Sequence, residues 1–357
     1  MIPRVSMSLP VLIILAVSPG GFPATSEGLT LSPPLYGTAM LFREKKGRLL
    51  DSITRSLSPD GNRVLLILVD LIKHTGEIAV HDLRSGRTKT LVEQERPVQI
   101  NASGYYAEGC WLDSGNRAVL TRQYARANSI GLFDESYDVC LLNTDTGAIS
   151  ALTERIDGHV SLAGVAKGGI LLLRESMRSD RYDLYLVSVD GGTKRLDVPF
   201  PLADGNRGDL RISYVCPQIR SRTDELYCFR DKANSKTGES ARDLVAADIA
   251  SSIPALRKAP LPLDIGYLQS FRWDQEGQRL AVLAYDSDDL LIYDGQFRLI
   301  QRFPRVGIGD PDSFVGSKLV FAGSPPGMNF VRFNQVGSTA LRIPYVLSLD
   351  DLASFIQ

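Results

Sequence analysis

The sequence has little net charge. Its 40 Lys and Arg residues are matched by 41 Asp and Glu residues, which leaves a formal net charge of -1. This balance gives no global field that would draw the chain to nucleic acid or to anionic lipid. A stretch of basic residues with interleaved aromatic residues is also missing, so we expect no nucleic-acid partner.

Histidine is scarce, and the three copies, His74, His81 and His159, stand apart from one another. The sequence lacks a Gly-x-Ser-x-Gly elbow and a glycine-rich phosphate loop, motifs that hold reacting groups at fixed separations. We therefore interpret each histidine as a hydrogen-bonded structural group. The sequence assigns no catalytic, cofactor-binding or metal-binding residue, and we expect no cofactor.

Only four cysteines are present, and none has the spacing of a metal site, which argues against zinc. Cys216 and Cys228 lie symmetrically about Arg222, in a hairpin that would place them on neighbouring strands. A disulfide between them is an option that the sequence leaves open. Cys110 and Cys140 fall on strands that a third strand separates, so we expect both to be free thiols.

Long hydrophobic runs are missing too. The apolar stretch from Leu9 to Val17 is well short of the about 20 residues that a membrane-spanning helix needs, so we expect no membrane span. Arg4 precedes this stretch and a Ser-Pro-Gly-Gly break follows it, a pattern typical of a secretory signal. We expect residues 1–27 to be a signal peptide or a disordered N-terminal segment, and the protein to be periplasmic or secreted. A peripheral segment of a cytosolic protein is the alternative.

What the chain does contain is a repeated β-hairpin. A short strand, a turn rich in Gly, Asp, Ser or Asn, and a run of branched and aromatic residues recur six times. The strands after the six turns begin near Val64, Ala118, Ile170, Leu226, Leu280 and Leu319. The intervals between them are nearly equal, apart from a shorter last one, which is typical of a repeat architecture.

A second turn follows each hairpin and joins two further apolar strands, as at Asp82–Gly86 and Asn143–Gly147. Each repeat therefore predicts four antiparallel strands, with Cys110 on the innermost strand of its sheet and Cys140 on the third. Four-stranded units repeated about an axis are typical of a β-propeller. We expect an all-β, six-bladed propeller over residues 36–346 and a short tail over 347–357. The last repeat ends early, so we expect the segment Gly37–Arg43 to complete the final blade and cover its edge.

The first repeat carries the most specific motif, Leu57-Ser58-Pro59-Asp60-Gly61-Asn62-Arg63-Val64, followed by a strand and an Asp-x-x-Ser-Gly turn. This motif resembles the repeat of TolB-like propellers, a WD-repeat-like family, and the resemblance implies six blades. The second and fifth repeats keep a Trp and the Gly, and the others match in pattern alone. Trp111 and Trp273 occupy matching places beside the turn, so we expect both to pack between blades.

Long connections gather on one face of the predicted propeller. Three second connections are long, namely Thr121–Tyr137, Arg174–Tyr182 and Arg230–Asp243, and binding residues often lie on such loops. They carry the basic residues Arg122, Arg126, Arg174, Arg178, Arg181, Arg230, Lys232, Lys236 and Arg242. Acidic residues are interleaved with these, namely Asp134, Glu135, Glu175, Asp180, Asp231 and Glu239. The mixture favours a solvated surface of both signs over an anion-binding patch.

These features predict a non-catalytic, monomeric binding or scaffold propeller that recognises a protein or peptide partner through its long-loop face, with no ligand-binding residue assigned. The alternative is a propeller hydrolase or lyase of the lactonase kind, with a site at the channel mouth that takes one side chain from each blade, in some cases around a metal. A purely structural module within a larger assembly is the third possibility. Fold alone does not choose among them.

Overall fold

In the computed structural model, the strands described below all lie within Pro34–Gln357. The described residues are 39–40, 44–45, 48–49, 51–70, 75–95, 104–113, 115–127, 133–166, 169–176, 181–196, 198, 200, 210–234, 236–251, 255–261, 268–284, 289–303, 308–324, 331–334, 337–340 and 343–350. The expected signal segment, residues 1–27, lies outside them. No helix in the described part of the chain combines the length and the hydrophobicity that crossing a membrane would need.

The first three blades are antiparallel sheets whose strands follow in chain order from the inside outward. Blade 1 consists of β4 (Asp51–Leu57), β5 (Arg63–Asp70), β6 (Thr75–Asp82) and β7 (Arg87–Glu95). Blade 2 consists of β8 (Tyr105–Trp111), β9 (Arg117–Ala127), β10 (Phe133–Asn143) and β11 (Ile149–Ala151), and β12 (Ile156–Asp157) also pairs with β10. Blade 3 consists of β13 (His159–Ala166), β14 (Gly169–Ser176), β15 (Arg181–Val187) and β16 (Thr193–Leu196).

The last three blades repeat this plan. Blade 4 consists of β17 (Leu210–Arg220), β18 (Glu225–Asn234), β19 (Ser240–Asp248) and β20 (Arg257–Lys258). Blade 5 consists of β21 (Leu268–Trp273), β22 (Arg279–Ala284), β23 (Asp289–Asp294) and β24 (Leu299–Phe303). Blade 6 consists of β25 (Ile308–Val315), β26 (Lys318–Ser324), β29 (Ile343–Ser348) and β1 (Ala39–Met40).

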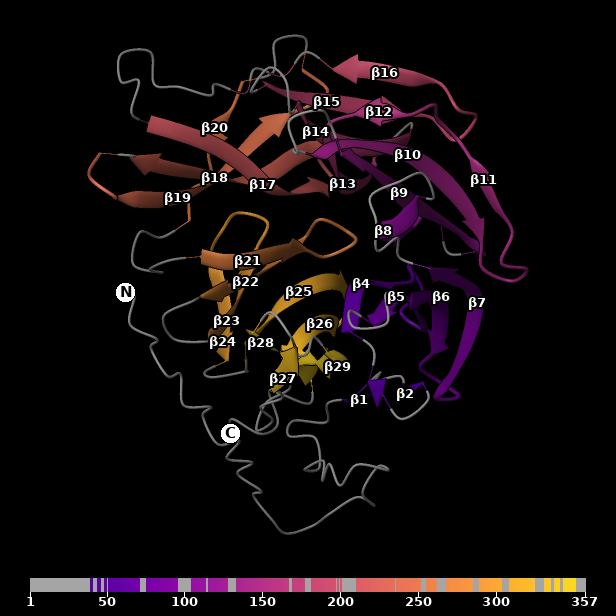
Figure 1. Ribbon diagram of the computed structural model, residues 1–357. Helices are drawn as coiled ribbons and strands as arrows, with labels where there is room; N and C mark the ends of the chain where they lie inside the picture. Colours follow the sequence, from indigo (N-terminus) through magenta and orange to yellow (C-terminus); the bar gives the residue numbers. More distant parts are fainter. Residues whose placement is uncertain are drawn as a thin grey trace, which may run out of the picture. The chain divides into compact units, whose positions relative to one another are not determined.

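The innermost strands form a closed ring. Strand β4 contacts β8, β8 contacts β13, and the contacts continue through β17, β21 and β25 back to β4. Figure 1 shows the six sheets arranged around this ring. The six-bladed propeller of four-stranded antiparallel blades is therefore confirmed, and Cys110 and Cys140 lie on the innermost and third strands of blade 2.

The predicted closure by an N-terminal strand is also confirmed. Strand β1 is the outermost strand of blade 6 and pairs with β29, with Ala39 opposite Val346 and Met40 opposite Tyr345. Of the predicted segment 37–43, residues 39 and 40 are described and both are paired; β2 (Glu44–Lys45) and β3 (Arg48–Leu49) then pair with each other as a hairpin. A second small hairpin, of β27 (Val331–Asn334) and β28 (Gly337–Ala340), is inserted between β26 and β29.

The turn of the first hairpin in blade 1 is stabilised by short polar side chains. In blade 1 the Ser58 hydroxyl donates to Asp60, and Asp60 accepts a further bond from the Asn62 amide at 3.2 Å. Burial opposes ionisation of Asp60, but these hydrogen bonds from Ser58 and Asn62 outweigh it and lower the pKa of Asp60 to about 2. Gly61 completes the turn at φ +68°, a left-handed conformation that glycine adopts without strain.

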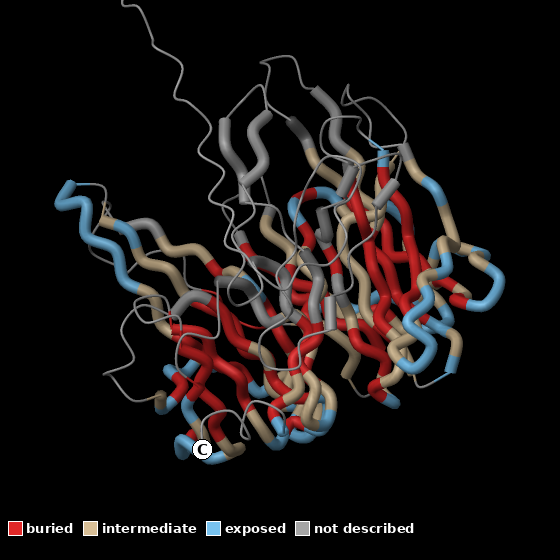
Figure 2. The backbone as a smooth tube through the Cα atoms, turned by 90° about the horizontal axis from the view of Figure 1, so that it is seen from below, coloured by how far each residue is buried: buried red, intermediate tan, exposed pale blue. Residues whose placement is uncertain are grey.

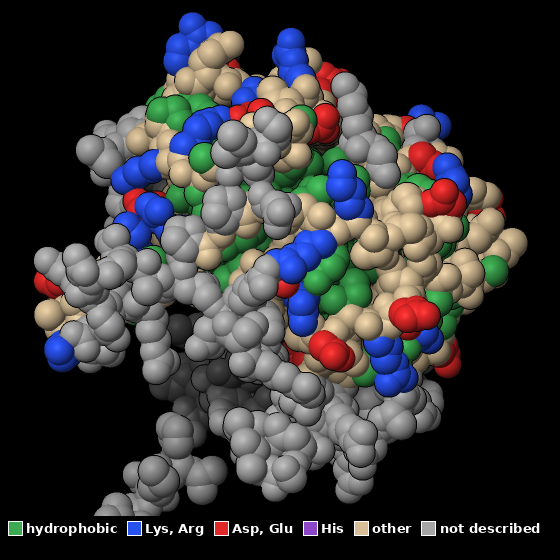
Figure 3. Space-filling model, turned by 90° about the horizontal axis from the view of Figure 1, so that it is seen from above, with side chains coloured by type: hydrophobic (Ala, Val, Ile, Leu, Met, Phe, Trp, Pro, Cys, Tyr) green, Lys and Arg blue, Asp and Glu red, His purple; other side chains and the backbone are tan. Residues whose placement is uncertain are grey.

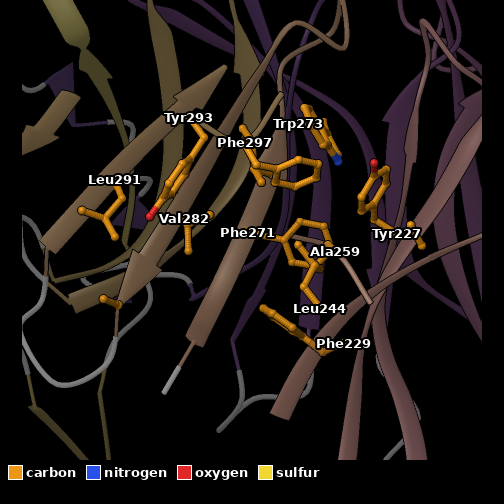
Figure 4. Close-up of a cluster of buried hydrophobic side chains, with 13 residues drawn as sticks. Tyr227, Phe229, Leu244, Ala259, Phe271, Trp273, Val282, Leu291, Tyr293 and Phe297 are labelled. Atoms are coloured by element: carbon orange, nitrogen blue, oxygen red, sulfur yellow. The ribbon is translucent and has the colours of Figure 1, made fainter. Parts of the chain in front are cut away.

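The apolar core lies between blades, and the strand centres are buried while the turns are exposed (Figure 2). Between blades 4 and 5 the core is aromatic, and Figure 4 shows Tyr227 facing Trp273 and Phe297 while Phe271 lies above Phe229. The centroids of the Tyr227 and Trp273 rings are 5.1 Å apart, and those of Phe229 and Phe271 are 4.8 Å apart in an edge-on arrangement. Both tryptophans are buried as predicted, Trp111 at 5% and Trp273 at 4% exposure.

Basic residues connect each of four blades to the next by the same hydrogen bond. In each case the side chain donates to the backbone carbonyl of the glycine in the neighbouring hairpin turn. The pairs are Arg63 with Gly115, Arg220 with Gly277, Arg279 with Gly316, and Lys318 with Gly61. The last bond, at 2.8 Å, joins blade 6 to blade 1. The hairpin motif therefore supplies the contacts between blades as well as the turn itself.

Candidate functional site

The predicted long loops are largely strand. Strands β9 and β10 stay paired as far as Ala127 and Phe133, and β18 and β19 as far as Ala233 and Ser240. The prediction of loops over Thr121–Tyr137 and Arg230–Asp243 was therefore wrong. Polar residues on both strands of a solvated hairpin give the composition of a loop, although the backbone groups form a regular ladder.

The basic residues of these hairpins are paired with carboxylates across the ladder. Arg122 donates to both oxygens of Asp138, at 3.0 and 2.5 Å, and Arg230 donates to Asp243 at 3.0 Å. Arg242 donates to both oxygens of Asp231. Arg174 is 3.1 Å from Asp183, and Lys232 is 3.6 Å from Asp243. The side chains of Arg126, Arg178 and Arg181 lie outside the described residues, and Lys236 is exposed.

These carboxylates belong to a pattern that the sequence analysis did not use. An acidic residue precedes the apolar run of the third strand in five blades, at Glu77, Asp138, Asp183, Asp243 and Asp289. Four of the five are nearly fully buried. Each is held by a residue of the second or fourth strand, such as Thr90 for Glu77 and Arg302 for Asp289. Figure 3 shows charges of both signs interspersed on one face of the molecule, which agrees with the expected mixed-charge surface.

A different set of polar side chains stands out at the junction of blades 2 and 3. Glu135 and Tyr137 of β10 meet His159, the first residue of the innermost strand β13. The Tyr137 hydroxyl donates to Glu135 Oε2 at 3.1 Å, and His159 Nδ1 lies 3.2 Å from the same oxygen and 3.1 Å from the hydroxyl. We call these three residues the His159 cluster. It lies where second connections and crossovers emerge, the face predicted to carry recognition.

The backbone around His159 is fixed by a glycine. The amide of Gly158 donates to the Glu135 carbonyl at 2.8 Å, which joins the start of β13 to β10. Gly158 has φ +101°, and a Cβ at this position would overlap the carbonyl oxygen of Glu175. Only glycine fits this approach of two strands, so Gly158 sets where the imidazole stands.

Polar side chains on neighbouring strands of blade 2 surround the buried side of the His159 cluster. Tyr105, Gln123 and Tyr137 lie opposite one another on β8, β9 and β10, and the Tyr105 hydroxyl donates to Gln123. Tyr137 is only 2% exposed and its ring meets His159 edge-on, whereas the His159 side chain is 49% exposed. The imidazole is therefore held from the protein side and open to solvent.

The electrostatics of the cluster follow from these contacts. The hydrogen bond that His159 donates to the Glu135 carboxylate raises the pKa of His159, and the same bond lowers the pKa of Glu135. Burial raises the pKa of Tyr137, and the neighbouring Glu135 raises it further. At neutral pH the cluster holds an ionised carboxylate, a neutral phenol and an imidazole that gains a proton readily.

A second carboxylate, Glu108, lies on the innermost strand of blade 2. Its Oε2 accepts a hydrogen bond from the Leu162 amide of blade 3 at 2.6 Å. Burial raises the pKa of Glu108, while the Leu162 amide, His159 and Arg272 oppose that rise. Arg272 stands on β21, three blades around the ring, so its charge acts on Glu108 from the opposite side of the axis.

The arrangement has the parts of a proton-transfer site. Nδ1 of His159 is engaged by a carboxylate, so the second ring nitrogen, Nε2, is the atom that would accept or donate a proton. A carboxylate in that position also fixes the tautomer and orientation of an imidazole. Among the described residues, no group of three or more His, Cys, Asp or Glu side chains is placed to hold a metal ion.

The other residues singled out from the sequence lie apart from this cluster. His81 is buried on β6 and its Nδ1 is 2.8 Å from the Thr88 hydroxyl, a structural contact. His74 falls outside the described residues. No disulfide joins the described cysteines, and Cys140 and Cys228 are buried whereas Cys216 is exposed.

Sequence reasoning missed the His159 cluster because its members come from two repeats. No fixed spacing joins Glu135, Tyr137 and His159, and the sequence interpretation of His159 was a structural group. One signal was present: Glu135 and Tyr137 alternate on a strand and so share a face, and His159 opens the next repeat. That signal gains meaning only once blades 2 and 3 are known to be neighbours.

No protein-family model matches the chain, and no curated protein matches it. Among solved structures it is similar to TolB from Acinetobacter baumannii, with 14% identity and a TM-score of 0.45 over 71% of this chain and 54% of that one. It is also similar to the Pyrococcus horikoshii acylaminoacyl peptidase, with 15% identity and a TM-score of 0.45 over 82% and 44% of the two chains. The chain spans about half the length of these two proteins.

A third similar structure is the α-L-arabinofuranosidase Arb93A from Fusarium graminearum, in complex with an iminosugar inhibitor. Identity is 10% and the TM-score is 0.51, over 88% of this chain and 98% of that one. Identities this low show a shared fold and leave the function of this chain open.

Proposed function

We propose that the protein is an exported, monomeric propeller that binds a protein or peptide partner at the face where the second connections emerge, with the His159 cluster inside the contact area. The observation that carries the proposal is the half-exposed His159 ring, held on its protein side by Glu135 and by the buried Tyr137. Most of the binding free energy of an interface comes from a few residues, and we expect His159, whose ring is held by the protein on one side and exposed to solvent on the other, to be one of them.

The charged residues near the His159 cluster are paired with one another, which argues against recognition by overall charge. The nearby Arg122 and Arg174 are engaged by Asp138 and Asp183, so their charges are largely neutralised at short range. We therefore expect a partner to be recognised through a few hydrogen bonds to polar side chains held in fixed positions. The carboxylate of Glu135 and the imidazole of His159 suit backbone amides and side-chain hydroxyls of a peptide.

The test is affinity capture from an envelope or secreted fraction with wild-type protein, His159→Ala and Lys194→Ala. Lys194 is exposed on the outermost strand of the same blade and serves as the matched control. We expect one partner to be recovered with the wild type and with the Lys194 variant, and at least tenfold less with the His159 variant. Equal recovery with all three proteins would contradict the proposal, and so would recovery of no partner.

A second candidate function is a propeller hydrolase or lyase in which His159 transfers a proton. The specific observation in its favour is the Glu135–His159 pair, with the Nδ1 to Oε2 distance of 3.2 Å. It predicts turnover of a lactone or a uronate-containing sugar that His159→Ala abolishes and Glu135→Gln reduces. Elemental analysis of the purified protein would test whether a divalent metal accompanies such activity. Activity that survives both substitutions would exclude the cluster as its source.

A further inference from the structure

The first hairpin of blade 4 brings two cysteines together at an irregularity of the ladder. Val215 pairs with Phe229, and the next paired residues are Gln218 and Tyr227. Two residues of β17, Cys216 and Pro217, therefore lie opposite the single residue Cys228 of β18. This is the pattern of a β-bulge, which interrupts the ladder, bends the strand and changes the direction of a side chain.

The bulge gives the two thiols different environments. Cys228 is fully buried among the apolar residues between blades 3 and 4, whereas Cys216 is exposed. Burial raises the pKa of Cys228 to about 12, and the neighbouring Cys216 contributes to that rise, which places the two thiols within electrostatic range. The thiol of Cys216 is accessible to reagents, and the thiol of Cys228 is buried on the facing strand.

The backbone of Cys216 is unusual as well. Its φ is +52°, in the left-handed region, where a residue with a Cβ is disfavoured and glycine is the common occupant of a bulge. A non-glycine residue in this conformation lowers the free energy of unfolding, and a disulfide bond formed by the Cys216 side chain would offset that loss. Facing residues of antiparallel strands have Cβ atoms about 4.5 to 5.5 Å apart, and a disulfide spans about 3.5 to 4.5 Å, so a small inward movement at the bulge would bring the two cysteines into bonding range.

We propose that Cys216 and Cys228 form a disulfide that closes the hairpin of β17 and β18 under oxidising conditions. The Cys216 thiolate attacks an external low-molecular-weight disulfide and releases one thiol. The Cys228 thiolate then attacks the Cys216 sulfur of the mixed disulfide and releases the second thiol. The two cysteines together lose two protons and two electrons, and the external disulfide is reduced to two thiols.

The experiment treats purified, folded protein with oxidised glutathione, blocks remaining thiols with N-ethylmaleimide, and measures intact and peptide masses. We expect the wild type to lose two hydrogen atoms and to yield a linked pair of peptides that contain Cys216 and Cys228. Reduction with dithiothreitol should restore both alkylation sites. The double variant Cys110→Ser/Cys140→Ser is the matched control and should form the same bridge.

Two outcomes would overturn the proposal. One is a stable glutathione adduct on Cys216 that Cys228 does not resolve, even in mild urea. The other is linkage that persists in Cys216→Ser or involves Cys110 or Cys140. The variant Cys228→Ser should stop at the glutathione adduct, which shows that Cys216 is accessible in folded protein. Because the readout is mass alone, failure here is distinct from failure of the partner-binding proposal.

Discussion

The junctions between blades 4 and 5 and between blades 2 and 3 are built from the same repeat but hold different chemistry. In blade 4 the residue before the acidic position of the third strand is Arg242, which pairs with Asp231 across the ladder and covers the Phe229 ring. In blade 2 the corresponding residues are Tyr137 and Gln123. The ion pair of Arg242 and Asp231 in blade 4 is thus replaced in blade 2 by the phenol of Tyr137 and the amide of Gln123. His159 lies next to Tyr137.

This difference shows how a propeller separates stability from recognition. Between blades 4 and 5 the aromatic residues pack against one another and against Arg220, whose guanidinium lies 4.4 Å from the Trp273 ring centroid. Between blades 2 and 3 the apolar cluster is aliphatic apart from Tyr137 and the partly buried Tyr185, and at the second-connection end it gives way to ionisable groups. The first junction should therefore control unfolding, and the second should control binding with little effect on unfolding.

The strongest test of this division is Trp273→Ala. The indole is buried against Tyr227 and Phe297, so the variant loses aromatic packing and leaves a cavity. Its Nε1 has no hydrogen-bond partner among the described residues, so the loss is almost entirely one of packing. We expect the free energy of unfolding to fall by about 3–5 kcal/mol, measured by urea denaturation. Trp273→Phe should lose much less, and equal losses for the two variants would contradict the packing argument.

Much of this junction was accessible from the sequence. The repeated hairpin motif placed Trp273 beside a turn and predicted its burial, because a hairpin pattern is local and its apolar alternation specifies which face is covered. The closure by residues before the first blade followed from an incomplete last repeat. The β-bulge at Cys216 was not predicted, because the symmetric spacing about Arg222 assumed a regular register, and register depends on contacts outside the hairpin.

The candidate site was less predictable for a physical reason. Its members lie on different blades, and their proximity depends on the stacking of whole sheets, which local patterns do not encode. The extended hairpins were mistaken for loops because their outward residues are polar on both strands. Paired charges such as Arg122 and Asp138 are separated by a turn in the sequence, and the register that sets them opposite each other follows from the ladder.

A moderate effect is expected from Tyr137→Phe. The phenol donates to Glu135 and contacts His159, so the variant loses one hydrogen bond between polar groups that are partly buried. The ring stays and its packing is unchanged, so the free energy of unfolding should fall by about 1 kcal/mol. If the junction of blades 2 and 3 serves binding rather than stability, partner capture should fall several-fold although the free energy of unfolding changes little. A loss comparable with that of Trp273→Ala would show that the His159 cluster supports the fold instead.

The smallest effect is the pH dependence of His159→Gln. Because Glu135 raises the pKa of His159 in the folded state, protonated His159 contributes stability in full below its unfolded pKa of about 6.5, and loses it as pH rises through the folded value. Glu135 has a lowered pKa, so its charge persists down to about pH 4.5. The stability difference between wild type and variant should therefore be largest between about pH 5 and 6 and smaller at about pH 8.5.

Since the ring is 49% exposed, solvent screening keeps the difference below about 1 kcal/mol. Urea denaturation across this range measures it, and a difference that grows with pH would mean that the imidazole is not paired with Glu135 in solution.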